Sequence, residues 1–186
     1  MRKIPAWSRH FDTAPLGYLL RKAHPDRWLR VHSLPESKRY STGPEEQEIV
    51  LHRQATLAAE LLTTDPVQLI TVQWAAVPDE SSQAKQIAHF GDRTFHALGH
   101  LGRAIDPVDG GPSFWASDGT WENALERQAL LAIANDEIRA LWLNTRSGEV
   151  FAPYDGGVDL ILQCRERRDA LRLKYVEWLS GRSDGL

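Results

Sequence analysis

The chain has 186 residues, of which 42% are hydrophobic and 25% charged, and 22 Lys and Arg against 25 Asp and Glu leave a formal net charge of −3. This near-neutral balance argues against binding nucleic acid through overall positive charge. The apolar content is too high for a disordered chain. No apolar run approaches the roughly 20 residues that span a bilayer, so we expect no membrane span.

The single cysteine, Cys164, excludes a disulfide within the chain and favours a reducing, cytoplasmic setting. We expect its thiol to be buried as a small hydrophobic group. The basic N-terminus is not followed by an apolar stretch, which predicts that no secretory signal is present. The length predicts one domain over residues 1–186, with a core large enough to need no structural metal.

The first half of the chain predicts a short helix, a strand, a long helix and a second strand, in that order. The apolar cluster between Pro15 and Pro25 suits the short helix. Residues 27–34 alternate as a strand does, and Pro35 ends the run. The long helix begins at Pro44, has acidic residues in its first turn, and ends before residue 65. Residues 67–77 are β-prone and predict the second strand.

Residues 78–119 carry three prolines and six glycines. They predict loops around one or two short elements, with a turn at residues 109–112. A structureless loop of that length is unusual in a compact domain. Two alternatives stay open: unrecognised strands near Phe90 and Phe95, or a functional excursion.

The last third of the chain has the clearest periodicity. It predicts a helix over residues 121–134 and an amphipathic helix over residues 165–180, which Gly181 would cap. Three short strands joined by turns are expected between these helices, at residues 138–143, 149–152 and 158–162. The prediction is an α+β fold: a mainly antiparallel sheet with a C-terminal three-strand meander, covered by helices on one face.

The first candidate site spans the end of the strand at residues 27–34 and the turn that follows it. Its polar side chains are Arg30, His32, Ser37, Lys38, Arg39 and Tyr40. Lys and Arg at such a turn suit a phosphate or carboxylate, and Arg can bind it with two hydrogen bonds. The alternative is a solvated turn in which Glu36 pairs locally with Lys38 or Arg39.

The second candidate site is the turn that contains Tyr154, Asp155 and Asp159. Two carboxylates flank the glycine pair 156–157, which would let the backbone approach a ligand. Paired carboxylates can bind a cation or perform acid–base chemistry. The alternative is a hairpin turn, with Asp159 on the solvated face of a strand.

Other chemistry is less well supported. His96 and His100 are spaced for one helical face with His89 nearby, but the H-E-x-x-H pattern is missing and Gly99 weakens a helix. We therefore expect no metal and no cofactor. Of the seven tryptophans, four are predicted to lie in the core (Trp28, Trp74, Trp142 and Trp178). The other three (Trp7, Trp115 and Trp121) could form a protein interface or be buried in the core, and exposed Trp115 or Trp121 would favour a homodimer.

Three segments resemble a set of small bacterial proteins of uncharacterised function. They are RVHSLPESKRY at residues 30–40, FAPYDGGVDLIL at residues 151–162 and YVEWLSGRSDGL at residues 175–186. The resemblance implies a bacterial cytoplasmic protein and implies no activity.

Two functions from different classes follow. The first is a non-enzymatic protein that binds another protein, as small immunity or adaptor proteins do, since no catalytic motif withstands inspection. The second is an enzyme or small-ligand binder that acts on an anionic substrate between the two candidate motifs. The second hypothesis requires residues 30–40 and 154–159 to meet in space.

Overall fold

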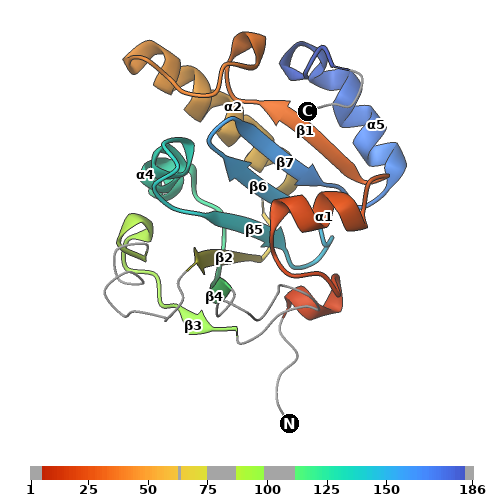
Figure 1. Cartoon of the computed structure of the whole chain (residues 1–186). Helices are drawn as coiled ribbons and strands as arrows, with labels where there is room; N and C mark the ends of the chain where they lie inside the picture. The colour runs from red at the N-terminus through yellow and green to blue at the C-terminus, as the bar shows by residue number, and fades with distance from the viewer. Residues whose placement is uncertain (1–5, 63, 75–86, 99–111, 183–186) are drawn as a thin grey trace.

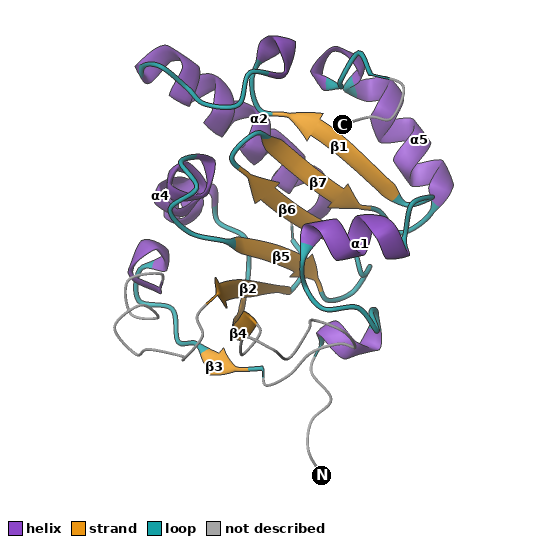
Figure 2. Cartoon of the chain, viewed as in Figure 1, coloured by secondary structure: helices purple, strands orange, loops and turns teal. Residues whose placement is uncertain are grey.

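The computed structural model describes residues 6–62, 64–74, 87–98 and 112–182. These residues form an antiparallel sheet of seven strands in the order β1-β7-β6-β5-β2-β4-β3 (Figures 1 and 2). The strands are β1 (Trp28–His32), β2 (Val67–Trp74), β3 (His96–Ala97), β4 (Pro112–Gly119), β5 (Ala140–Asn144), β6 (Val150–Tyr154) and β7 (Gly157–Ile161). The helices are α1 (Gly17–Ala23), α2 (Pro44–Leu62), α4 (Asn123–Ala134) and α5 (Arg165–Lys174).

The α+β class is confirmed, and so is the C-terminal meander of β5, β6 and β7. The long helix begins at Pro44 as predicted, with Glu45 and Glu46 in its first turn. The last helix is shorter than predicted. It ends at Lys174, and a 3-10 turn at Val176–Trp178 follows, so Gly181 does not cap it.

The middle of the chain holds a strand that periodicity did not reveal. β4 pairs with β2 along eight residue pairs, from Val67↔Gly119 to Trp74↔Pro112. Pro, Ser, Asp and Gly occupy five of its eight positions and mask its β character, and the pairing with β2 overrides that local propensity. β3 lies beside Phe95, where a strand was one of the alternatives. Residues 78–86 and 99–111 of this predicted loop region lie outside the described residues, as do residues 75–77 at the end of the predicted second strand.

Both faces of the sheet carry apolar clusters, so the expectation of helices on one face is wrong. One cluster, which we call the closed face, joins Val158, Leu160, Phe151 and Trp142 to residues of α2, α4 and α5. The opposite cluster, on what we call the α1 face, includes Ile161, Val150 and Leu141 with residues of α1 and the preceding segment. In Figure 1, α1 crosses in front of the sheet over β5, β6 and β7.

Several side chains differ from their predicted environment. Cys164 is exposed, because it precedes α5 at the end of the sheet. Trp7 is buried against Phe11 under the α1 face, which removes it from the surface group. Trp142 is buried as predicted. The remaining tryptophans with described side chains are half-buried: Trp28, Trp115, Trp121 and Trp178. The side chain of Trp74 lies outside the described part.

Candidate functional site

The two candidate motifs lie side by side in the sheet. β1 pairs with β7 so that Arg30 faces Asp159 and His32 faces Gly157. The β6–β7 turn brings Tyr154 and Asp155 to the same end of these strands. Residues more than 110 positions apart in sequence thus share one edge of the α1 face. This geometry meets the requirement that the two motifs come together.

Arg30 and Asp159 form a buried ion pair on the α1 face. Arg30 donates from Nε to Oδ1 at 2.8 Å and from Nη2 to Oδ2 at 2.9 Å, and the indole of Trp28 donates to Oδ1 at 3.0 Å. Burial alone would lower the pKa of the Arg30 guanidinium, but the hydrogen bonds and charge of Asp159 outweigh it and raise that pKa. The neighbours of Asp159 therefore use both of its carboxylate oxygens. The hairpin-turn alternative placed Asp159 on a solvated face, which is wrong, because the side chain is buried.

Tyr154 covers this ion pair. The Arg30 guanidinium lies 4.8 Å from the centre of the Tyr154 ring and 5.5 Å from that of Trp28, which places a cation between two aromatic faces. Burial raises the pKa of Tyr154 to about 12. The hydroxyl therefore stays protonated at neutral pH and can both donate and accept a hydrogen bond.

Asp155 is held from outside by the segment that follows β1. Arg39 Nε donates to its Oδ2 at 2.5 Å, and the Tyr40 hydroxyl donates to the same oxygen at 2.8 Å. The Asp155 side chain is only 7% exposed, whereas the Arg39 side chain is 64% exposed. No hydrogen-bond donor reaches Oδ1 of Asp155 from the described residues.

Among the described residues, Lys38 and Ser37 donate no hydrogen bond to Asp155. Lys38 is paired with Glu46 at 2.7 Å, which helps to lower the pKa of Glu46 to about 2. Ser37 is exposed and has a φ of 57°, as part of a tight turn with Glu36. The expected local pairing of Glu36 with Lys38 or Arg39 is wrong, because both cations have other acidic partners.

His32 ends β1 as a buried side chain whose Nε2 has no hydrogen-bond partner among the described residues. Its backbone carbonyl accepts a hydrogen bond from Arg53 at 2.9 Å. Burial, and then the positive charge of Arg30, lowers the pKa of His32. The imidazole is therefore neutral at physiological pH and adds no positive charge to the site.

The glycine pair serves the fold. A Cβ at Gly157 would lie 2.3 Å from the carbonyl oxygen of Val31, and one at Gly156 would lie 3.0 Å from the Tyr154 ring. Glycine at position 157 is required for this close approach of β1, whereas a Cβ at position 156 would need only a small shift of the tyrosine ring. The space beside the two glycines is therefore filled by other parts of the same chain. The sequence had suggested that a ligand would approach the backbone there.

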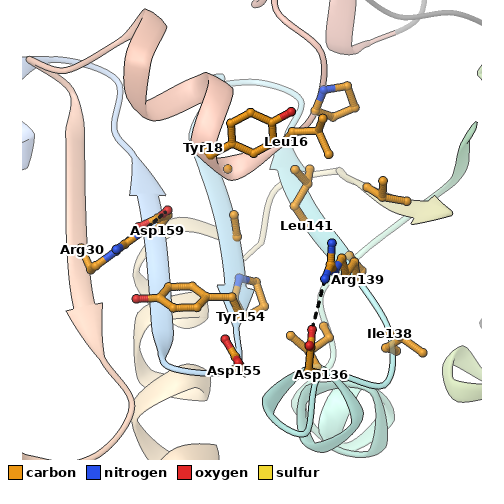
Figure 3. Close-up of a pocket in the computed structure, with 17 residues that line it drawn as sticks. Leu16, Tyr18, Arg30, Asp136, Ile138, Arg139, Leu141, Tyr154, Asp155 and Asp159 are labelled. Atoms are coloured by element: carbon orange, nitrogen blue, oxygen red, sulfur yellow. Dashed lines mark hydrogen bonds and ion pairs between the residues drawn. The ribbon is translucent and has the colours of Figure 1, made fainter. Parts of the chain in front are cut away.

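A cavity of about 260 Å³ opens beside these residues on the α1 face (Figure 3). Its floor is apolar, with Leu16, Val72, Leu141 and Ala152 among its residues. Arg30, Asp159 and Tyr154 form one side, and Asp136 and Arg139 lie across from them. The volume is slightly below the roughly 300–1,000 Å³ of drug-sized sites, so it suits a small ligand.

Residues 16–183 match the model of a family described as a domain of unknown function, DUF3885. The chain belongs to this family. Every candidate site residue lies within the matched DUF3885 segment. Comparison with curated proteins and with solved structures found no match.

Two groups of cavity residues in this DUF3885 chain were not foreseen from the sequence. Leu16, Gly17 and Tyr18 come from the start of α1, and Asp136 and Arg139 come from the turn between α4 and β5. The break at residues 135–136 was visible as a helix end, but no sequence pattern indicated that this turn would face residues 154–159. Only the packing of α1 across the sheet brings them together.

The described residues contain no group of three His, Cys, Asp or Glu side chains placed to bind a metal ion. His89 and His96 are described, and His100 lies outside the described residues. In the part of the chain that the structure covers, no helix has the length and apolar character needed to cross a bilayer.

Proposed function

We propose that this protein is a non-enzymatic binding protein that holds a small, mainly apolar organic ligand in the cavity on the α1 face. The observation that carries the proposal is the combination of an apolar floor with converging polar groups, which is the usual composition of a small-molecule site. Two of those groups, Arg30 and Asp159, already satisfy each other, so this side of the cavity presents no unpaired charge to the ligand.

The charges around the cavity support a ligand with no strong negative charge. Arg30 is paired with Asp159, Arg39 with Asp155 and Arg139 with Asp136. The three cations and three carboxylates cancel, so the site has little net potential to attract a phosphate. This differs from the anionic substrate that the sequence suggested, because the sequence did not reveal the partners of the basic residues.

A cavity-filling variant tests the proposal. A panel of uncharged fragments that includes benzyl alcohol is titrated into the protein and followed by ¹H–¹⁵N correlation spectra. Ala152 lines the cavity, so Ala152→Leu should weaken binding at least tenfold. Ala170→Leu, at an exposed position of α5, is the matched control and should leave binding unchanged. Equal binding to a folded Ala152→Leu variant, or no binding of any fragment to the wild type, contradicts the proposal.

A second candidate function is the binding of a protein partner, and one surface feature favours it. Leu173 in α5 and Val176 in the 3-10 turn after it are 79% and 63% exposed, so two large apolar side chains three positions apart lie on the surface. Leu173→Asp and Val176→Asp should abolish co-purification of a partner from the native host, and should shift the elution volume if the partner is a second copy. Unchanged elution and unchanged co-purifying proteins would remove this candidate.

We also propose a bacterial, cytoplasmic setting. The support is the single cysteine of the chain and the resemblance of its motifs to small bacterial proteins. The exposed position of Cys164 fits a compartment that keeps thiols reduced.

A further inference from the structure

The three carboxylates that line the cavity differ in how fully their oxygens are used. Both oxygens of Asp159 accept hydrogen bonds from Arg30, and one of them also accepts from Trp28. Asp136 is half exposed and has a weak contact with Arg139 at 3.5 Å. Asp155 is buried, yet the two donors that reach it share Oδ2. The carboxylate with unused capacity is thus Asp155.

Oδ1 of Asp155 accepts no hydrogen bond from the described residues, and it is not one of the fully buried atoms that lack a partner, so solvent or a ligand can reach it. A carboxylate offers about four lone-pair sites, so a donor on a ligand can form a charge-assisted hydrogen bond with this oxygen. Asp155 lies at the end of the cavity that also holds Asp136 (Figure 3). Both carboxylates help to raise the pKa of Arg39, which places Asp136 within electrostatic reach of the same side chain.

We infer that the ligand carries a cationic amine, with its ammonium group on Asp155 and its apolar body against Leu141 and Ala152. The inference rests on the proposed function, since it names the chemical class of ligand for the same cavity. An ammonium group supplies up to three donors and a positive charge, and hydrogen bonds of this kind are about twice as strong as neutral ones. Asp136 lies at the same end, where its ion pair with Arg139 is long at 3.5 Å.

An anionic ligand is disfavoured by the same geometry. The guanidinium of Arg30 directs Nε and Nη2 to Asp159, so its charge is largely neutralised. Lys38 is bound to Glu46 at a distance from the cavity, and it is not among the cavity residues. Arg139 shares its charge with Asp136. The end of the cavity at Asp155 is where added positive charge gains most.

Arg39 competes with the ligand for the Asp155 carboxylate. Its guanidinium is mostly in solvent and contacts Asp155 from outside the cavity, so the pair is screened and adds little stability. Removing this charge leaves Asp155 with Tyr40 alone. An amine ligand should therefore bind more tightly when Arg39 is replaced, a result that a purely structural role for Asp155 would not produce.

The test titrates benzylamine, benzyl alcohol and benzoate into the full chain and follows each by ¹H–¹⁵N spectra. We expect benzylamine to bind at least tenfold more tightly than benzyl alcohol, and benzoate to bind most weakly. Asp155→Asn should reduce benzylamine to the affinity of the alcohol and leave the alcohol unchanged. Arg39→Gln should tighten benzylamine at least threefold. Asp169→Asn, at an exposed position of α5, is the matched control and should change nothing.

The outcomes separate the two proposals. Equal affinity for the amine and the alcohol, or an amine preference that survives in Asp155→Asn, overturns the amine inference and leaves the cavity as a binding site. Tighter binding of benzoate overturns it in favour of an anion held at Arg30. If none of the three probes shifts resonances of the cavity residues, the proposed function itself is wrong.

Discussion

The two faces of the sheet are built from the same strands but bury different kinds of side chain. On the closed face, apolar side chains of the strands pack against α2, α4 and α5 into a continuous core. On the α1 face, the short helix α1 and the segment before it pack over one apolar part. The remaining part of the α1 face holds a buried ion pair and a cavity. A helix of seven residues is too short to cover a seven-stranded sheet.

Strand β7 shows how one residue creates this difference. Val158 and Leu160 point to the closed face, while Asp159 and Ile161 belong to the α1 face. Side chains alternate between the two faces along a strand. Asp159 therefore places one carboxylate on the α1 face, among side chains that are otherwise apolar. The lesson is that a polar residue at an alternating position predicts a solvated face only where nothing covers that face.

The largest effect should come from the closed face. Phe151→Ala removes a fully buried ring that contacts Trp121 and Trp142, and it should cost about 3–5 kcal/mol in the free energy of unfolding. Leu141→Ala on the α1 face should cost only about 2 kcal/mol, since that side chain already borders a cavity. Urea unfolding of both variants measures the contrast. A cost for Leu141→Ala equal to that for Phe151→Ala would show that the two faces are packed alike.

The ion pair should make the α1 face sensitive to charge. Asp159→Ala leaves the Arg30 guanidinium, 17% exposed, without its carboxylate and should destabilise the protein by about 3 kcal/mol. The double variant Arg30→Met with Asp159→Leu should recover most of that loss, because well-packed apolar residues replace such pairs at little cost. Denaturant unfolding of the single and double variants gives the comparison. A double variant no more stable than Asp159→Ala would contradict it.

The approach of β1 to the β6–β7 turn gives an intermediate effect. Gly157→Ala places a methyl group against the Val31 carbonyl and should destabilise by about 1–3 kcal/mol. Gly43→Ala, where nothing lies within 4 Å of an added Cβ, should change stability by less than about 0.5 kcal/mol. Thermal unfolding monitored by circular dichroism tests both. Equal melting temperatures for the two variants would argue against the close approach.

The smallest expected effect is a pH dependence carried by two histidines near the α1 face. Burial is the main cause that lowers the folded-state pKa of His24 and of His32 below the ordinary value of 6.5. The folded state then binds fewer protons than the unfolded state, so this stability is complete above pH 6.5 and declines as the pH falls through the folded-state pKa.

Melting temperatures between pH 7.5 and 5.5 should show this decline. The His32→Gln variant should have a shallower slope over the same window, because one of the two groups no longer titrates. An identical slope in the variant would remove His32 as a cause. A melting temperature that rises on acidification would reverse the sign of the argument for both histidines.

The regular elements were predictable because their signals are local. Pro44 with the acidic turn after it marks the start of α2, and the turn at residues 155–156 marks the β6–β7 hairpin. β4 was not predictable, since its proline, serines and terminal glycine become a strand only by pairing with β2. The candidate site was half predictable: Arg30, Arg39, Asp155 and Asp159 stood out as polar groups in two dense motifs. The sequence did not reveal how these residues pair or that Asp155 is buried.

The sequence by itself determined the α+β class, the order of most elements and the two motifs that form the polar wall of the site, because periodicity, turns and caps depend on neighbours along the chain. Only the tertiary structure decided that Arg30 neutralises Asp159, that Arg39 reaches Asp155, and that α1 leaves part of the sheet open over a cavity. Those outcomes depend on strand register and on which segment covers which face. Both are set by contacts between residues more than 100 positions apart, for which a single sequence carries no local signal.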